Sequence, residues 1–182
     1  MTSAVPRQIA LLRGINLGAR NRVSMPELRE LLTGLGHEDV KTLLQSGNVV
    51  LTSDEAGEQL ERALERAIAK ELGVESKVVV RSARELAGVV KRDPFGDVAD
   101  DPKRYQVSFL SAKPKADVVK ALEAADVAPE QVVVSGREIY AWHPEGIQRS
   151  PLVKLLTDKK LGVTATARNW STVTNLLELA RA

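Results

Sequence analysis

The sequence contains no cysteine, which excludes disulfide bonds, zinc fingers, iron–sulfur ligands and thiol nucleophiles. Aromatic residues make up only 3% of the chain, and there are just two histidines, His37 and His143. The 26 basic and 24 acidic residues nearly cancel, so net charge alone does not indicate a nucleic-acid or membrane partner. Composition therefore points to an ordinary globular protein and leaves its function open.

Long apolar runs are missing as well. The first run, residues 9–12, ends at Arg13 and is shorter than the apolar part of a signal peptide. No stretch approaches the roughly 20 apolar residues that a membrane-spanning helix needs. We therefore expect a soluble, cytoplasmic protein. Its length of 182 residues suits one ordinary domain or two small ones.

The first half of the chain alternates strand and helix signals. Ser24 and Glu27 form a capping-box pattern ahead of an apolar stripe, and Ser46-Gly47-Asn48 separates two short strands as a hairpin turn does. The predicted strands are 7–13, 40–45, 49–52 and 77–81. The predicted helices are 24–35, a long helix that starts at residue 53 or 54 and ends near 72, and 82–90. The order βαββαβ is that of a ferredoxin-like fold.

The second half repeats this order after a polar connection with two prolines. The predicted strands are 104–110, 131–134, 138–142 and 163–167, and the predicted helices are 115–124, 150–160 and 171–181. Ser135-Gly136 repeats the hairpin pair Ser46-Gly47, and Arg168 repeats Arg81 after the last strand of its half. We infer an internal duplication.

The expected fold is thus α+β, with two tandem ferredoxin-like (α-β plait) subdomains whose antiparallel sheets carry helices on one face. The first subdomain is expected at residues 1–92, the connection at 93–103, and the second subdomain with a C-terminal helix at 104–182.

Three segments carry a family resemblance. They are Leu-Leu-Arg-Gly-Ile-Asn at 11–16, Gln-Ser-Gly-Asn-Val at 45–49, and Thr-Ala-Arg-Asn-Trp at 166–170. Together they resemble the bacterial family designated domain of unknown function 1697. The resemblance covers nearly the whole chain. It implies two ferredoxin-like subdomains in tandem and no particular activity.

Polar residues gather where the first and last strands end, and they form our candidate site. Residues 7–22 contain four arginines and no acid, and arginine offers a planar fork of donors that suits phosphate or carboxylate. Glycine-rich turns also allow backbone N–H groups to approach an anion. The candidate ligand-binding residues are Arg13, Asn16, Arg20, Asn21, Gln45, Ser46, Asn48, Arg168, Asn169 and Trp170. We expect them to hold a phosphate-containing small molecule, a nucleotide or a nucleic acid.

A structural alternative competes with this site. Arg168 and Asn169 can cap the last helix, and arginines on loops are usually solvated. An enzyme acting on a phosphorylated or carboxylated metabolite between the subdomains is the second functional hypothesis, with Arg13, Asn48 and Arg168 positioning the substrate. A purely structural partner protein is the third.

Other arrangements are weaker. Tyr105, Phe109, Tyr140 and Trp142 fall on two strands, where an RNA-binding domain stacks bases, but their alternation favours a core face. Both histidines are expected to be solvated. No spacing indicates a metal site, a Walker loop or a cofactor, and Ser46 is better explained by the turn than as a nucleophile.

Overall fold

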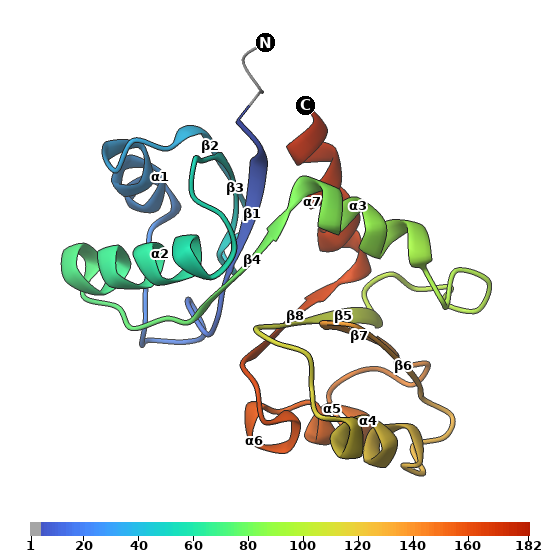
Figure 1. Ribbon diagram of the computed structural model, residues 1–182. Helices are drawn as coiled ribbons and strands as arrows, with labels where there is room; N and C mark the ends of the chain where they lie inside the picture. The colour runs from blue at the N-terminus through green and yellow to red at the C-terminus, as the bar shows by residue number, and fades with distance from the viewer. Residues whose placement is uncertain (1–4) are drawn as a thin grey trace. The chain divides into compact units, whose positions relative to one another are not determined.

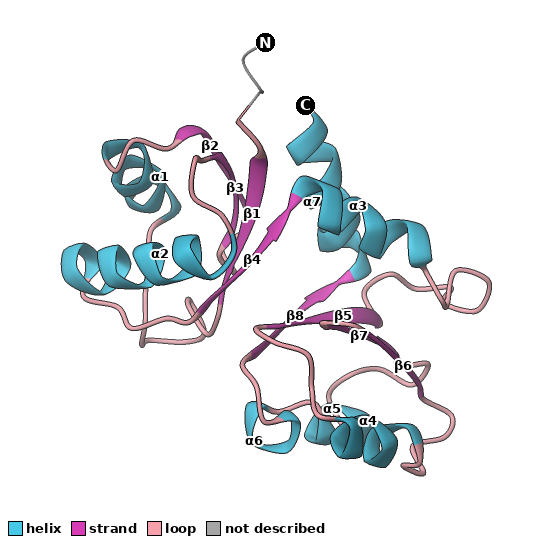
Figure 2. Ribbon diagram, viewed as in Figure 1, coloured by secondary structure: helices cyan, strands magenta, loops and turns pink. Residues whose placement is uncertain are grey.

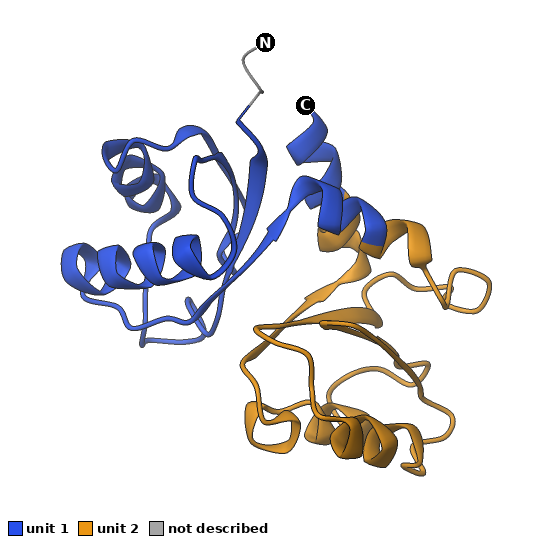
Figure 3. Cartoon of the chain, in the orientation of Figure 1, with its two compact units in different colours: residues 1–88, 175–182 blue, residues 89–174 orange. Residues whose placement is uncertain are grey.

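The computed structural model describes residues 5–182, so residues 1–4 of the expected first subdomain lie outside the description. The chain divides into two compact units (Figure 3). Unit 1 comprises residues 1–88 and 175–182, and unit 2 comprises residues 89–174. The division falls inside two helices, α3 (Ala83–Arg92) and α7 (Trp170–Arg181).

Unit 1 contains a four-stranded sheet in the order β2-β3-β1-β4, and every neighbouring pair is antiparallel. Its strands are β1 (Arg7–Leu12), β2 (Glu38–Leu43), β3 (Asn48–Thr52) and β4 (Val78–Ser82). Helices α1 (Met25–Gly34) and α2 (Gly57–Leu72) cover one face (Figure 1).

Unit 2 repeats this architecture with the order β6-β7-β5-β8, again fully antiparallel. Its strands are β5 (Tyr105–Leu110), β6 (Gln131–Ser135), β7 (Glu138–Trp142) and β8 (Ala165–Asn169). The helices on one face are α4 (Ala116–Glu123), α5 (Pro151–Leu155) and α6 (Asp158–Leu161). Figure 2 shows the same succession of strands and helices in both units, which confirms the predicted tandem ferredoxin-like fold.

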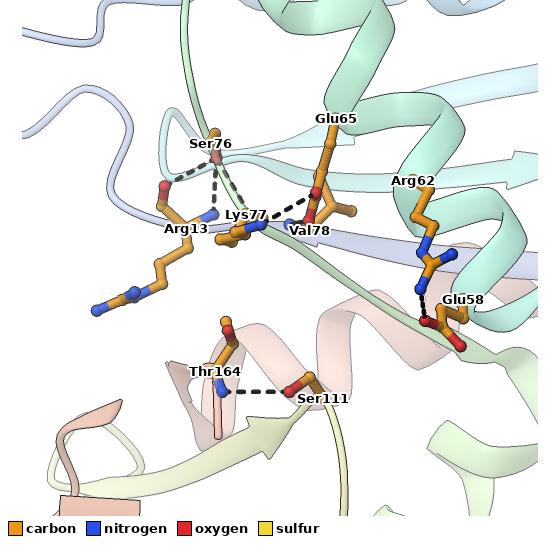
Figure 4. A network of polar contacts seen from close by, with 9 residues as sticks. All are labelled: Arg13, Glu58, Arg62, Glu65, Ser76, Lys77, Val78, Ser111 and Thr164. Atoms are coloured by element: carbon orange, nitrogen blue, oxygen red, sulfur yellow. Dashed lines mark hydrogen bonds and ion pairs between the residues drawn. The ribbon is translucent and has the colours of Figure 1, made fainter. Parts of the chain in front are cut away.

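Equivalent backbone contacts support the duplication. The N–H of Leu12 donates to Gly47 O at 2.8 Å in unit 1, and the N–H of Leu110 donates to Arg137 O at 2.9 Å in unit 2. In each unit a serine hydroxyl also closes the end of the central strand (Figure 4). Ser76 Oγ accepts from the Arg13 N–H at 3.1 Å, and Ser111 Oγ accepts from the Thr164 N–H at 3.1 Å.

The helix ends show where neighbouring residues were sufficient to predict a helix boundary and where they were not. Ser24 caps α1 as predicted, because its hydroxyl accepts from the Glu27 N–H at 3.4 Å. The predicted start of α2 at residue 53 or 54 is wrong: the helix begins at Gly57, and the Ser53 hydroxyl instead accepts from the Glu55 N–H. Apolar spacing sets the buried face of a helix but not its first residue.

The predicted single helix at 150–160 is also wrong. Two short helices, α5 and α6, replace it, and Thr157 lies between them with its hydroxyl accepting from the Lys160 N–H. A side-chain acceptor at that position favours a new helix start over a continuous helix.

Both units have a core between sheet and helices. In unit 1, leucines of α1 and α2 pack on alternate residues of the strands, and in unit 2 the same arrangement is built around Leu110, Ile139 and Leu152. The aromatic residues Tyr105, Phe109, Tyr140 and Trp142 are buried on the other face of the second sheet, as their alternation predicted. Their burial removes them as a stacking platform for bases.

The outer edge of β4 is protected by helix α2. The outward N–H groups of Val78 and Val80 donate to Glu65 Oε1 at 3.0 Å and to Glu61 Oε1 at 2.9 Å. Two carboxylates one helical turn apart thus satisfy alternate donors of an edge strand. In unit 2, Asp158 serves the Ala165 N–H at 3.0 Å in the same way.

Within residues 5–182, none of the helices combines the length and apolarity needed to cross a bilayer.

Candidate functional site

The loop that follows β1 is held in one shape by Asn16. The side-chain amide of Asn16 donates to Val23 O at 2.9 Å, its oxygen accepts from the Val23 N–H at 2.9 Å, and its backbone N–H donates to Asn21 O at 3.0 Å. The amide also donates to Gln45 O at 2.6 Å, which ties this loop to the β2–β3 turn. One asparagine therefore assembles two segments that are far apart in the sequence.

Residue types in this loop match its backbone conformation. Asn16 and Asn21 have φ of +55° and +52°, and Gly14 and Gly18 have φ of +67° and +81°. Left-handed conformations cost asparagine and glycine less than other residues. The glycines and asparagines that suggested an anion site are thus required in part by the path of the chain.

The β2–β3 turn is built by the remaining polar candidates. Asn48 is fully buried, and its amide donates to Leu43 O at 2.8 Å and to Ser46 Oγ at 2.9 Å. Gly47 has φ of +86°, and a Cβ there would lie 2.7 Å from Leu12 Cβ. The turn therefore packs tightly against the end of β1, and Ser46 and Asn48 build it, which supports the turn interpretation of Ser46.

The charged side chains of the loop are all positive. Arg13, Arg20 and Arg22 are exposed, and no acidic residue occurs from Arg7 to Pro26. In Figure 4 the side chain of Arg13 extends away from Lys77, while its backbone N–H and C=O both bind the Ser76 hydroxyl. This loop therefore carries only positive side-chain charges.

The candidates near the end of the chain belong to unit 2, and they lie in different surroundings. Arg168 was predicted to follow the last strand but lies inside β8, with 8% of its surface exposed. Its guanidinium donates to Thr166 Oγ1 at 2.7 Å and to Ala167 O at 2.9 Å. Burial lowers the pKa of Arg168 to about 10, so the side chain is still charged at neutral pH.

Asn169 and Trp170 both have partners within unit 2. Asn169 Oδ1 accepts from the Thr172 N–H at 2.9 Å and caps α7, which confirms the capping interpretation for this residue. The ring of Trp170 stacks on Tyr105, with centroids 4.5 Å apart and planes 10° from parallel. The strand-end candidates thus form two separate sets. Unit 1 holds Arg13, Asn16, Arg20, Asn21, Gln45, Ser46 and Asn48; unit 2 holds Arg168, Asn169 and Trp170.

A buried polar group in unit 2 was not predicted. His143, expected to be solvated, is completely buried, so that expectation is wrong. Its Nδ1 lies 2.9 Å from Glu130 Oε1 and 3.1 Å from Ser150 Oγ, and Glu130 Oε2 accepts from the Leu152 N–H at 2.9 Å. The only advance signal was the Ser150-Pro151 helix start, because sequence spacing does not connect Glu130 with His143.

Hydrogen bonds keep Glu130 ionised despite its burial. Burial by itself raises the pKa of this carboxyl, but donors from His143, Ser150 and the Leu152 amide outweigh it and hold the pKa below its ordinary value. The group does not resemble a catalytic triad, in which the hydroxyl and the carboxylate occupy opposite ring nitrogens. Here both face Nδ1, and Nε2 is buried with no hydrogen-bond partner among the described residues.

His37 is partly buried, and burial lowers its pKa. Among residues 5–182, no group of three or more histidine or acidic side chains is placed to hold a metal ion.

Comparison with known proteins supports the fold and the family. A solved structure of a conserved bacterial protein from Streptococcus pneumoniae, SP0830, is similar over 96% of this chain and 98% of that one, with a TM-score of 0.78 and 24% identity. No curated protein matches the sequence. A family model described as protein of unknown function (DUF1697) matches residues 5–140. The match includes the segments at 11–16 and 45–49 that carried the resemblance, while the segment at 166–170 lies beyond the matched residues. The chain belongs to the DUF1697 family of proteins of unknown function.

Proposed function

We propose that this protein binds an anionic, phosphate-bearing ligand through the arginines of the loop after β1. The observation that carries the proposal is the exposure of Arg13, Arg20 and Arg22 on a segment that Asn16 fixes and that contains no carboxylate. A guanidinium can donate two parallel hydrogen bonds to a phosphate, and several together favour a ligand with more than one phosphate oxygen to share.

The fixed loop supports affinity as well as charge. A segment already ordered by hydrogen bonds loses little conformational entropy when a ligand binds. At Gly14 and Gly18 nothing lies within 4 Å of where a Cβ would be, so the backbone there is open to a ligand. We place the contacts on the three arginines and give Arg168 a structural part, because Thr166 and Ala167 bind its guanidinium.

The polar group buried in unit 2 does not add a catalytic function. The histidine, carboxylate and serine that lie together in unit 2 share one ring nitrogen, and this arrangement gives the serine no separate base. No specific geometric observation favours the enzyme hypothesis.

The test is a titration of the full chain with inorganic pyrophosphate, with ATP, and with a fluorescent single-stranded oligonucleotide, followed by NMR and anisotropy. We expect binding that falls about tenfold or more in R20E/R22E. The control is R149E, which reverses an exposed arginine of unit 2 and should leave binding unchanged.

Salt dependence separates the two ligand sources. An oligonucleotide neutralised by several arginines loses affinity steeply with salt, with a slope of about 0.7 per phosphate contact in a logarithmic plot. Saturable pyrophosphate or ATP binding with a shallow slope indicates a small ligand. Absence of binding by all three probes, or equal binding by R20E/R22E, would overturn the proposal.

A further inference from the structure

The two most exposed large apolar side chains among residues 5–182 belong to leucines beside the arginine loop. Leu17 is 77% exposed and Leu44 is 60% exposed. Leu17 follows Asn16 and Leu44 precedes Gln45, and the 2.6 Å hydrogen bond from Asn16 to Gln45 O joins their segments. The two leucines are thus carried by neighbouring segments, and we call the pair the Leu17–Leu44 patch; Arg20 and Arg22 belong to the same loop as Leu17.

The backbone of Leu44 is as unusual as its exposure. Its φ is +61°, in the left-handed region, which is unfavourable for an L-residue with a bulky side chain. Burial of the side chain does not offset this cost, because the side chain is 60% exposed. Strained positions of this kind concentrate at sites that act on something outside the chain.

The turn that carries Leu44 is rigid. Gly47 packs against Leu12 and Ile15, with its ideal Cβ position 2.8 Å from Ile15 Cδ1, and Asn48 is buried and bonded to Leu43 O. The other leucine sits on the loop that Asn16 closes. Both apolar groups are thus presented on fixed backbone, which reduces the entropy lost when a partner covers them.

We propose that the Leu17–Leu44 patch docks another protein, at an apolar pocket of that protein bordered by carboxylates. Arginine is enriched at protein interfaces, and the fully buried centre of an interface is more apolar than its rim. Because no acidic residue occurs from Arg7 to Pro26, negative charge on the partner is the complementary choice. This inference goes beyond the proposed phosphate binding and does not depend on it, because leucine adds nothing to phosphate recognition.

The hollows formed by residues 5–182 fit the patch poorly, so a second copy is the poorer occupant. The apolar groove of about 320 Å³ between α4 and α6 has Lys160 beside Asp117 at its border and is not acidic. The pocket at the start of acidic helix α2 is lined only by charged and amide side chains.

A third hollow, lined by Val127, Pro129 and Pro151, does carry two carboxylates. However, Glu130 is already bound by His143 and by the Leu152 N–H, and Arg149 lines the hollow together with Glu145.

A membrane surface fits less well than a protein. Interfacial membrane binding normally uses the continuous apolar face of an amphipathic helix, and two leucines on loops bury far less area.

The experiment selects peptides from a random phage-displayed library on the full chain and then measures the affinity of the selected peptides, made synthetically. We expect enriched sequences in which Asp or Glu flank Leu, Ile, Phe or Trp. Their Kd should rise about tenfold or more in L17S, in L44N and in R20E/R22E. Asparagine is used at position 44 because it tolerates the left-handed backbone.

The matched control is L35S, an exposed leucine at the end of α1, which should change Kd less than about twofold. Failure to enrich any sequence, or selected peptides that bind L17S and L44N unchanged, would overturn the inference. So would leucine-dependent self-association in the ultracentrifuge, or leucine-dependent binding to vesicles of equal phosphatidylcholine and phosphatidylglycerol or to the oligonucleotide. Pyrophosphate binding retained in L17S and L44N would show that phosphate binding does not require the two leucines, so the two proposals are tested independently.

Discussion

Arg81 and Arg168 occupy the same position in the two halves of the duplicated fold. Arg81 lies opposite Ile9 of the central strand in unit 1, and Arg168 lies opposite Val107 in unit 2. The guanidinium of each donates to the carbonyl of the preceding residue at 2.9 Å. A repeated buried arginine that binds its own edge strand has a structural task in both units.

Arg168→Ala should destabilise the protein by about 2–4 kcal/mol, because it leaves a cavity and removes the donor of Thr166 and Ala167 O. Chemical denaturation followed by circular dichroism measures this loss. Exposed Arg20 is the control, and its alanine variant should stay within about 0.5 kcal/mol of the parent. Equal losses for the two variants would contradict the structural task.

Asn16→Gly should lower the free energy of unfolding by about 1–3 kcal/mol, because the bonds to Val23 and Gln45 disappear while glycine retains the left-handed backbone. Asn21→Gly is a close match, since φ is nearly the same and Asn21 is exposed. A difference between the two variants in urea unfolding isolates the amide of Asn16. No difference would mean that the loop is held by other contacts.

Gly47→Ala should cost about 2–4 kcal/mol, because the new methyl group overlaps Leu12 and Ile15 and also meets a backbone at φ of +86°. Gly73, the left-handed cap of α2, has φ of +65° and no atom within 4 Å of a new Cβ. Gly73→Ala should therefore cost only about 1 kcal/mol. Thermal unfolding measures the stability of both variants. Gly47→Ala reports steric overlap together with backbone strain, and Gly73→Ala reports backbone strain alone.

Glu130 should make stability depend on acid pH. Its pKa is held below the ordinary value of 4.5, so the unfolded chain takes up the proton more readily than the folded one. The stabilisation by the carboxylate is complete above pH 4.5 and is lost as pH falls through the lower folded pKa.

The unfolding free energies of the parent and E130Q should accordingly differ most at neutral pH and converge in acid. Urea titrations at several pH values measure this difference. A constant gap between the two proteins across the whole range would show that Glu130 is not ionised in the folded state.

Periodic apolar residues and turn-forming residues were sufficient to predict the order of elements. Ser24 and the Ser46-Gly47-Asn48 turn act through neighbours within a few positions, so their effects are visible in the sequence. The break at Thr157 was not predicted, because one continuous helix and two short helices would show the same periodic pattern of apolar residues.

The candidate site was only partly predictable, because some of its contacts join residues that are far apart in the sequence. The arginines and glycines could be recognised by residue type, but the clamp from Asn16 to Val23 and Gln45 is made of contacts closed by the fold. Burial of Arg168 and His143 also arises from tertiary packing. The residues next to them in the sequence do not distinguish them from solvent-exposed side chains.

The glutamates that serve the β4 edge have a consequence for how the protein behaves when concentrated. Three glutamates, Glu65, Glu61 and Glu85, accept from the N–H groups of Val78, Val80 and Ser82 along β4, whereas on β8 Asp158 accepts from Ala165 and Ala167 is exposed to solvent. An unsatisfied donor on an outer strand is a point where a foreign strand can add. Intermolecular sheet growth, and with it aggregation, is therefore better guarded against at β4 than at β8.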